Sequence, residues 1–270
     1  MILFPNAKIN IGLNIVSRRP DGYHNLETVL YPLGIRDALE VVDADQLKFT
    51  SSGLRIPGNP DDNLCLKAYH MLAEDFKVPP VHIHLHKHIP IGAGLGGGSA
   101  DASFFIRLMN EKYGLGLDNL QMEAYATRIG SDCAFFIQNK AAFAFEKGDK
   151  LKNIALDLSK YHIILVMPGI RIYTAEAYQG LKTDALSNSF PDLLKIPVEE
   201  WKLSVKNDFE SSVFSRYPLI AEIKSALYHS GALFASMSGS GSSVYGIFKE
   251  ELKLPFLEKD NQVFYLTENR

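Results

Sequence analysis

One glycine-rich stretch, residues 90–100, most constrains what this chain can fold into. Its residues are Pro90, Ile91, Gly92, Ala93, Gly94, Leu95, Gly96, Gly97, Gly98, Ser99 and Ala100. Apolar residues recur at helical spacing after Ser99, which predicts a helix from Ser99 to about Tyr113 with Ser99 as its N-cap. A glycine loop that leads into a helix lets a ligand approach the main chain, and it presents free N–H groups at the positive end of the helix dipole. The stretch therefore predicts a phosphate-binding loop, with a flexible surface linker as the alternative.

The glycine spacing resembles two common nucleotide-binding motifs without matching either. Gly92 and Gly97 have the spacing of the P-loop glycines, but Gly98 stands where that motif requires a lysine. The dinucleotide-binding motif G-x-G-x-x-G also fits, and Asp118 follows about 20 residues later, as that fold requires. However, the strand-like run over 81–89 alternates polar and apolar residues, whereas a central parallel strand is apolar throughout. The stretch indicates a phosphate loop of another kind.

Length, charge and cysteine content narrow the class of protein. A chain of 270 residues is long enough for one large domain or two ordinary ones, and its formal charge of −3 argues against nucleic acid or an anionic membrane as the main partner. No apolar run approaches the ~18 residues of a membrane span, and the first residues do not resemble a signal peptide. Cys65 and Cys133 form no metal or redox motif. We expect a soluble cytoplasmic protein, present as a monomer or a weak homodimer.

A strand is predicted over residues 8–15, where polar and apolar residues alternate strictly. The apolar residues of this run are expected to face the core. The period of two then places Lys8, Asn10 and Asn14 together on the opposite face. From this stretch alone, the opposite face is either an ordinary solvated surface or a functional one.

One carboxylate stands out in the middle of the chain. Asp132 lies between Gly130, the predicted C-cap of a helix over 118–129, and an apolar run that begins at Cys133. An acidic residue in this position is either a helix N-cap or a buried functional carboxylate. The spacing does not favour one over the other.

Four histidines alternate along the predicted strand over 81–89 and are expected to project from one face. They are His82, His84, His86 and His88. Alternating histidines can bind a metal ion, but no carboxylate or cysteine accompanies them, and the run fits a half-exposed strand equally well. We predict no metal site there.

The remaining patterns predict an α+β protein with two domains. A helix is expected to begin at Asp61-Asp62-Asn63 and to end before Pro79. The second half reads as strands over 161–167, 232–237, 243–248 and 262–267, with helices over 173–181, 206–214 and 217–229 and a loop over 182–200. Because the segment 146–159 is polar and irregular, we place the boundary there, which gives domains 1–155 and 156–270.

Three separated stretches resemble the GHMP kinases, the family of galactokinase and of homoserine, mevalonate and phosphomevalonate kinases. They are the strand with Lys8 and Asn10, the glycine loop with the start of its helix, and Ser238-Gly239-Ser240-Gly241. The resemblance implies the two-domain GHMP kinase fold, with an N-terminal β-α domain, a ferredoxin-like C-terminal domain and the active site between them. It also implies that ATP donates the phosphoryl group and that Mg²⁺ accompanies it. The family's acidic magnesium ligand has no evident counterpart here.

The resemblance assigns roles to residues that the patterns leave open. Lys8 and Asp132 match the catalytic pair, with Asp132 orienting the substrate hydroxyl and accepting its proton while Lys8 keeps it ionised. The glycine loop is then expected to hold the ATP phosphates through its main-chain N–H groups. Asn63, Leu64 and Lys87 resemble adenine-pocket residues, although Asn63 also fits a plain helix start and Lys87 a surface lysine at a strand end.

Within the family, the stretch Arg19-Pro20-Asp21-Gly22-Tyr23-His24 most resembles kinases that phosphorylate the 2-hydroxyl of a cytidine-diphosphate-linked polyol in the non-mevalonate isoprenoid route. Tyr23 and His24 match the cytidine-recognising pair, and Asn10 is expected to help hold the diphosphate or polyol. Tyr173 either closes over the base or packs in the core. Ser238, Gly239, Ser240 and Gly241 either contact substrate phosphates or form a hairpin turn. Another GHMP kinase, such as a homoserine kinase, and a non-catalytic nucleotide-binding module are the alternatives.

Overall fold

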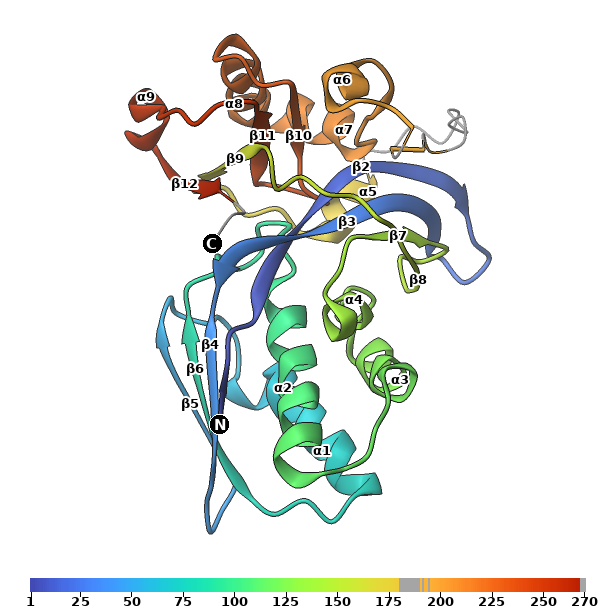
Figure 1. The fold of residues 1–270 in the computed structure, drawn as a ribbon, viewed down its shortest axis with the longest axis vertical. Helices are drawn as coiled ribbons and strands as arrows, with labels where there is room; N and C mark the ends of the chain where they lie inside the picture. The colour runs from blue at the N-terminus through green and yellow to red at the C-terminus, as the bar shows by residue number, and fades with distance from the viewer. Residues whose placement is uncertain (180–189, 191, 194, 268–270) are drawn as a thin grey trace. The chain divides into compact units, whose positions relative to one another are not determined.

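The computed structural model describes residues 1–179, 190, 192–193 and 195–267 (Figure 1). Two compact units make up the chain, and each is assembled from separated segments. The first unit comprises Met1–Lys8, Ile35–Ile91 and Gly96–Lys140, and the second comprises Ile9–Gly34, Gly92–Leu95 and Ala141–Arg270. The boundary between residues 155 and 156 stays a prediction.

A four-stranded sheet forms one layer of the first unit. Its strands, in spatial order, are β1 (Ile2–Leu3), β4 (Ala38–Asp43), β6 (Val81–Lys87) and β5 (Lys48–Gly53). Strands β4 and β6 are antiparallel and pair Leu39 with Leu85, whereas β5 and β6 are parallel. Leu39 and Leu85 are fully buried on one face, and Glu40 pairs with His84 on the other. The predicted alternation along 81–89 is therefore confirmed.

Helices form the other layer of the first unit. They are η1 (Pro60–Asp62), α1 (Leu64–Asp75), α2 (Gly97–Tyr113), α3 (Asn119–Ile129) and α4 (Cys133–Gln138), with α2 packed against α1, α3 and α4. The prediction of Ser99 as the N-cap of α2 is wrong. Gly96 occupies the cap with φ +68°, and the helix begins at Gly97, because a glycine takes the left-handed conformation at little steric cost. Helix α4 begins directly after Asp132, as the N-cap alternative for that residue required.

The second unit contains two four-stranded sheets. The first has the order β2 (Asn6–Arg18), β3 (His24–Arg36), β7 (Ala142–Phe145) and β8 (Lys150–Asn153), and its first two strands extend into the first unit. The second is fully antiparallel, with the order β12 (Asn261–Thr267), β9 (His162–Pro168), β11 (Val244–Phe248) and β10 (Phe234–Met237).

The connections of the second sheet make it ferredoxin-like. Helices α5 (Thr174–Gln179), η2 (Val198–Glu200), α6 (Trp201–Ser204), α7 (Phe209–Arg216) and α8 (Pro218–His229) lie between β9 and β10 in the chain, and α9 (Pro255–Glu258) lies between β11 and β12. In the sheet, β11 lies between β9 and β10, and β9 lies between β11 and β12. This interleaving of two β-α-β units is the split arrangement of the ferredoxin-like fold. The predicted α+β architecture is confirmed. Most of the predicted loop over 182–200 lies outside the described residues.

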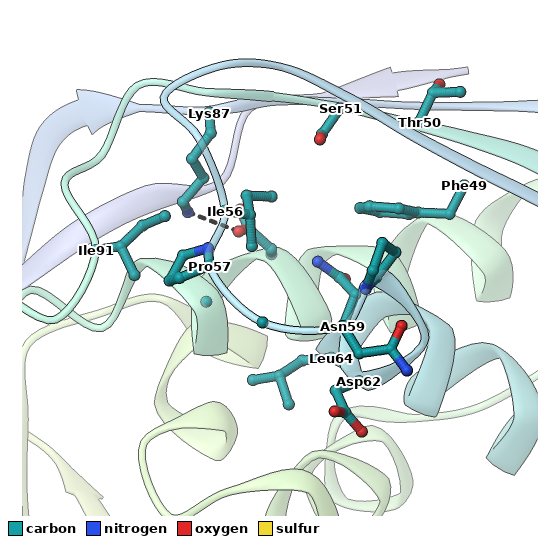
Figure 2. Close-up of a pocket in the computed structure, with 15 residues that line it drawn as sticks. Phe49, Thr50, Ser51, Ile56, Pro57, Asn59, Asp62, Leu64, Lys87 and Ile91 are labelled. Carbon is teal, nitrogen blue, oxygen red and sulfur yellow. Dashed lines mark hydrogen bonds and ion pairs between the residues drawn. The ribbon is translucent and has the colours of Figure 1, made fainter.

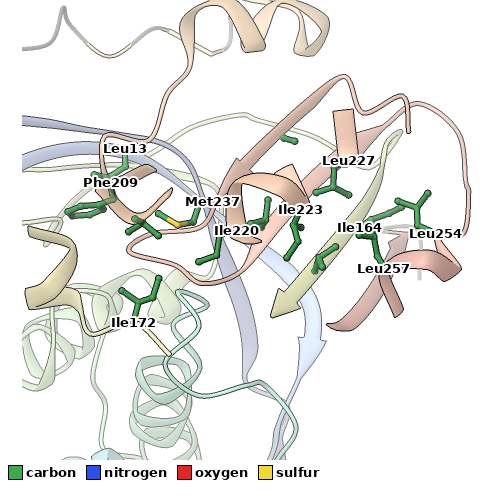
Figure 3. Close-up of a cluster of buried hydrophobic side chains, with 14 of the residues drawn as sticks. Leu13, Ile164, Ile172, Phe209, Ile220, Ile223, Leu227, Met237, Leu254 and Leu257 are labelled. Atoms are coloured by element: carbon green, nitrogen blue, oxygen red, sulfur yellow. The ribbon is translucent and has the colours of Figure 1, made fainter. Parts of the chain in front are cut away.

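An apolar core joins α7 and α8 to the second sheet (Figure 3). Ile220, Ile223 and Leu227 recur at helical spacing along α8 and are all buried. Phe209 at the start of α7 is 2% exposed and contacts the ring of Tyr178 edge-on at 4.8 Å. No helix in the described part of the chain is long and apolar enough to cross a membrane.

Phe209→Ala is expected to lower the free energy of unfolding by about 3–5 kcal/mol, because it removes a buried ring and leaves a cavity. Phe256→Ala is the matched control: that ring is 60% exposed, and its loss is expected to change stability by about 0.5 kcal/mol or less. Calorimetric melting of the two variants checks this. Equal losses of stability would contradict the assignment of Phe209 to the core.

Candidate active site

Lys8 and Asp132 form an ion pair within the first unit. Lys8 Nζ lies 3.2 Å from Asp132 Oδ2, and the Lys8 side chain is 4% exposed whereas that of Asp132 is 38% exposed. Asp132 occupies the N-cap position of α4, but its side chain makes no capping hydrogen bond. The N-cap alternative is therefore correct for the position of Asp132 but not for a capping bond, and the alternative of a buried carboxylate is wrong. The carboxylate is directed to a buried ammonium and remains open to solvent.

The polar face of β2 is buried. Lys8, Asn10 and Asn14 are all less than a tenth exposed, so the alternative of a solvated face is wrong. In the second unit, Asn10 Nδ2 donates to Thr28 Oγ1 at 3.1 Å, and the Asn10 main-chain N–H donates to Ser238 Oγ at 3.2 Å. These hydrogen bonds satisfy polar groups that burial would otherwise penalise.

Two glycines of the loop make room for two lysines. A Cβ at Gly96 would lie 3.1 Å from Lys8 Cε, and a Cβ at Gly97 would lie 3.0 Å from Lys87 Nζ. Both distances are tighter than ordinary carbon contacts, so a side chain at either position would push a lysine aside. The glycines thus bring two ammonium groups close to the main chain at the start of α2.

A pocket of about 270 Å³ lies in the first unit between β5 and the starts of α1 and α2 (Figure 2). Its wall includes the predicted Asn63, Leu64, Lys87, Ile91 and Gly98. Asn63 also caps α1, since its Oδ1 accepts a hydrogen bond from the Cys65 N–H at 2.9 Å. The pocket therefore brings together all three residues expected to contact adenine, and the helix-start interpretation of Asn63 holds as well.

Lys87 is buried between two aspartates, so its interpretation as a surface lysine is wrong. Its Nζ lies 2.5 Å from Asp37 Oδ2 and 2.6 Å from Asp101 Oδ2. Asp37 Oδ1 accepts hydrogen bonds from the main-chain N–H groups of His88 and Ile89, which fixes the end of β6. Sequence reasoning missed both aspartates. Lys87 continues the series of buried positions along β6, and a buried lysine requires an acidic partner, so this pattern could have pointed to them.

Within this trio, Asp101 has the least favourable environment for a charged carboxylate. Its Oδ1 is buried and has no hydrogen-bond partner. Burial raises the pKa of Asp101 to about 8, against the lowering effect of the Lys87 ammonium and with the help of the Asp37 charge. Burial alone would lower the pKa of Lys87, but Asp101 and Asp37 raise it above its ordinary value. Lys87 thus stays charged, whereas the raised pKa of Asp101 favours its protonated form near pH 7.

The other half of the glycine loop contacts the predicted Ser238–Gly241 segment within the second unit. That segment is part of the hairpin loop between β10 and β11, as one alternative required. Ser238 Oγ donates to the Gly94 carbonyl at 2.9 Å, and a Cβ at Gly94 (φ +78°) would lie 2.1 Å from the Ser238 carbonyl oxygen. Asn207 Nδ2 donates to the carbonyls of Met237 and Gly239. A contact of this hairpin with substrate phosphates stays a prediction.

The predicted cytidine-recognising residues lie on the second unit. His24 is half-buried and stacks on Tyr178 of α5, with ring centroids 4.7 Å apart and planes 18° apart. Tyr23 is exposed, and the Lys147 ammonium lies 5.4 Å from its ring centroid. Tyr173 is 62% exposed, so the core-packing alternative is wrong. Sequence reasoning missed Tyr178, whose place beside His24 depends on the packing of α5.

The pKa of His24 is lowered, first by burial and then by the charge of Arg18. A lowered pKa favours the neutral imidazole near pH 7. Neutral imidazole carries one N–H donor and one ring-nitrogen acceptor, which suits recognition of the polar edge of a base.

The alternating histidines of β6 bond to the neighbouring strand β5. Thr50 Oγ1 lies 2.8 Å from both His82 Nε2 and His84 Nδ1, and Ser52 Oγ lies 3.0 Å from His84 Nε2 and 2.9 Å from His86 Nδ1. The described residues contain no group of three or more His, Cys, Asp or Glu side chains that could hold a metal ion. These hydrogen bonds occupy four ring nitrogens of His82, His84 and His86.

Asp101→Asn is expected to change how stability depends on pH. An Asp with a pKa near 8 in the folded state and near 4 in the unfolded state is protonated only in the folded protein between these values, so its contribution to stability falls as pH rises through this window. The free energy of unfolding of the wild type, minus that of Asp101→Asn, should therefore decrease between pH 5 and pH 8. Urea unfolding across this range measures it, with Asp61→Asn at an exposed carboxylate as the control. A difference that stays constant or increases would contradict the environment described for Asp101.

Comparison with known sequences gives a consistent result over both halves of the chain. The sequence profile for the GHMP kinases N terminal domain matches residues 63–145, and that for the GHMP kinases C terminal matches residues 185–259. The chain is 49% identical to a 4-diphosphocytidyl-2-C-methyl-D-erythritol kinase of Bacteroides fragilis, over 99% of both chains. It is 51% identical to the kinase of the same name from Cytophaga hutchinsonii, over 92% of both.

A solved structure agrees with these sequence matches. The crystal structure of a 4-(cytidine 5'-diphospho)-2C-methyl-D-erythritol kinase matches with a TM-score of 0.84 and 28% identity, over 98% of each chain. Because two domain profiles span more than half of the chain, and relatives of about half identity cover nearly all of it, the chain belongs to the GHMP kinase family.

Proposed function

We propose that this kinase transfers the γ-phosphoryl group of ATP to the 2-hydroxyl of 4-diphosphocytidyl-2-C-methyl-D-erythritol, in the non-mevalonate route of isoprenoid synthesis. The names of relatives that align over nearly the full chain support this choice of substrate. The observation that carries the chemistry is the ion pair between the buried Lys8 ammonium and the partly exposed Asp132 carboxylate, beside Gly96 of the glycine loop.

Asp132 and Lys8 divide the work of phosphoryl transfer. The substrate oxygen bonds to the γ-phosphorus while the bond from that phosphorus to the leaving oxygen of ADP breaks, and the hydroxyl proton passes to Asp132. Asp132 is suited to this because its side chain is partly exposed to solvent while it pairs with Lys8. The Lys8 ammonium orients the carboxylate and stabilises negative charge at the reacting oxygen.

ATP is proposed to bind with its base in the pocket of the first unit and its phosphates on the glycine loop. The pocket wall carries apolar residues such as Phe49, Ile56 and Leu64, which suit the face of a purine ring (Figure 2). The start of α2 supplies main-chain N–H groups and the helix dipole for the phosphates. Mg²⁺ is proposed to bind together with ATP. In proteins this ion keeps several water ligands, binds phosphate oxygens and needs few carboxylates, and its charge would offset that of the phosphates.

Cytidine is proposed to bind at Tyr23 and His24 of the second unit. An exposed aromatic ring offers a face for base stacking, and the adjacent imidazole offers a donor and an acceptor for the base edge. Tyr178, stacked on His24, holds that imidazole in place. Asn10 and the Ser238–Gly241 loop are proposed to contact the diphosphate or polyol, and Tyr173 the base.

Cytoplasmic location and a monomeric or weakly dimeric state are part of the proposal. Cys65 and Cys133 are both free thiols and both buried, which supports a reducing compartment.

A substrate panel tests the function directly. ADP formation is measured with 4-diphosphocytidyl-2-C-methyl-D-erythritol, homoserine, mevalonate and phosphomevalonate at equal concentrations. We expect the first to be turned over with kcat/KM at least ~100-fold above the others, because only it offers a base to the Tyr23–His24 pair. Turnover of homoserine instead would make the chain a homoserine kinase, and no turnover with ATP binding intact would favour a non-catalytic binding module.

The position of phosphorylation has its own signature. The carbon that bears the 2-hydroxyl also bears the methyl group and carries no hydrogen. Proton-coupled phosphorus NMR of the product should therefore show the new phosphate without a three-bond proton coupling. A doublet or triplet would place the phosphate on another hydroxyl.

A further inference from the structure

Three loops of the second unit are fastened to one another. They are residues 92–95 of the glycine loop, residues 169–174 between β9 and the start of α5, and residues 238–243 between β10 and β11; we call them the three-loop cluster. The hydrogen bonds that join them are Ser238 Oγ to Gly94 O at 2.9 Å, Ser243 N to Ala93 O at 3.3 Å, Ser242 Oγ to Ile170 O at 2.5 Å and a contact between Thr174 Oγ1 and Ser240 Oγ at 3.2 Å.

Arg171 is the cation of this cluster. Its side chain is exposed, and its guanidinium carbon lies 5.1 Å from the ring centroid of Tyr173. A Cβ at Gly92, where φ is +70°, would lie 3.3 Å from Arg171 Nε, so the bare glycine lets the guanidinium lie against the loop. The arginine is thus held between an aromatic ring and the glycine loop.

Among the described residues, no carboxylate pairs with the charge of Arg171. Ion pairs in the described part of the chain involve Arg19 and Arg216, among others, but no described carboxylate pairs with Arg171. A guanidinium is always protonated near pH 7 and presents a planar fork of N–H donors that fits two oxygens of one phosphate. Arg171 is therefore a positioned cation with no carboxylate partner in the described part of the chain, and it lies beside a loop that suits phosphate.

The position also answers a question raised by the sequence. The glycine loop has Gly98 where the P-loop has its lysine, so the loop itself carries no cation for phosphate oxygens. We propose that Arg171 binds a phosphate oxygen of a bound polyphosphate at the three-loop cluster and supplies positive charge at this end of the glycine loop. The proposal rests on the proposed function only in that both ATP and a diphosphate-linked substrate bring such a group.

Inorganic pyrophosphate is the probe that tests the site without catalysis. Calorimetry compares its binding to the wild type, Arg171→Gln and Arg171→Lys. We expect Kd to rise about tenfold or more in Arg171→Gln, which keeps the apolar stem and a polar end but loses the charge and the fork, and to rise less in Arg171→Lys, which keeps the charge without the fork. Arg216→Ala is the matched control, because Arg216 is also exposed and lies 5.8 Å from a tyrosine ring, but pairs with Glu176; its Kd should match that of the wild type.

Steady-state kinetics identify the source of the phosphate. A rise in the KM for ATP in Arg171→Gln assigns the contact to the nucleotide, and a rise in the KM for the second substrate assigns it to the substrate diphosphate. A wild type that turns over no member of the panel contradicts the proposed function but leaves the pyrophosphate comparison decisive for Arg171. A pyrophosphate Kd in Arg171→Gln within twofold of the wild type, or no pyrophosphate binding to the wild type, overturns the proposal. Unchanged KM values for both substrates also overturn it.

Discussion

The proposed catalytic arrangement depends on the burial of one ammonium group, that of Lys8. A buried lysine is stable only where an opposite charge or hydrogen-bond acceptors compensate for lost hydration. Here β2 delivers Lys8, Gly96 makes room for its side chain by lacking a Cβ, and Asp132 supplies the carboxylate 3.2 Å away. Asp132 stands at the N-cap position of α4, but its side chain makes no capping hydrogen bond. The ion pair with Lys8, and not the helix, therefore orients the carboxylate.

Two of the lysine–aspartate arrangements described in the first unit have a buried lysine, and the exposure of their carboxylates separates their roles. Lys87, Asp37 and Asp101 are all buried, and together they fix the end of β6 against α2 and form part of the pocket wall. Such a closed trio holds a shape and offers no carboxylate to a substrate. In the pair of Lys8 and Asp132, the lysine is equally buried but the carboxylate is more than a third exposed. Only the second arrangement can accept a proton from a bound hydroxyl, and this contrast favours it as the catalytic one.

The sequence predicted the fold well where local patterns decide it. The period of two along β2 and β6, and the helical stripes of α1 and α8, give these elements and their apolar faces. A strand period says which residues share a face, but not what covers that face, so the burial of Asn10 and Lys87 required the tertiary structure. Ser99 is not the N-cap of α2, because Gly96 takes the cap position and the helix has already begun at Gly97. Asp101 and Tyr178 were missed because partners distant in the sequence give them their significance. The assignment of Lys8 and Asp132 as the proposed catalytic pair came from family resemblance, since spacing left Asp132 undecided.

We propose that Lys8 and Asp132 act as one unit in phosphoryl transfer, and a double-mutant cycle on kcat tests whether they do. The cycle compares Lys8→Met, Asp132→Asn and the double variant, with ATP binding measured by calorimetry in each. If the two act together, each single variant loses at least ~100-fold in kcat, the double variant is no worse than the more damaged single, and the Kd for ATP changes by less than about threefold. A kcat of Asp132→Asn within tenfold of the wild type, or a double variant whose loss equals the product of the single losses, would contradict the claim.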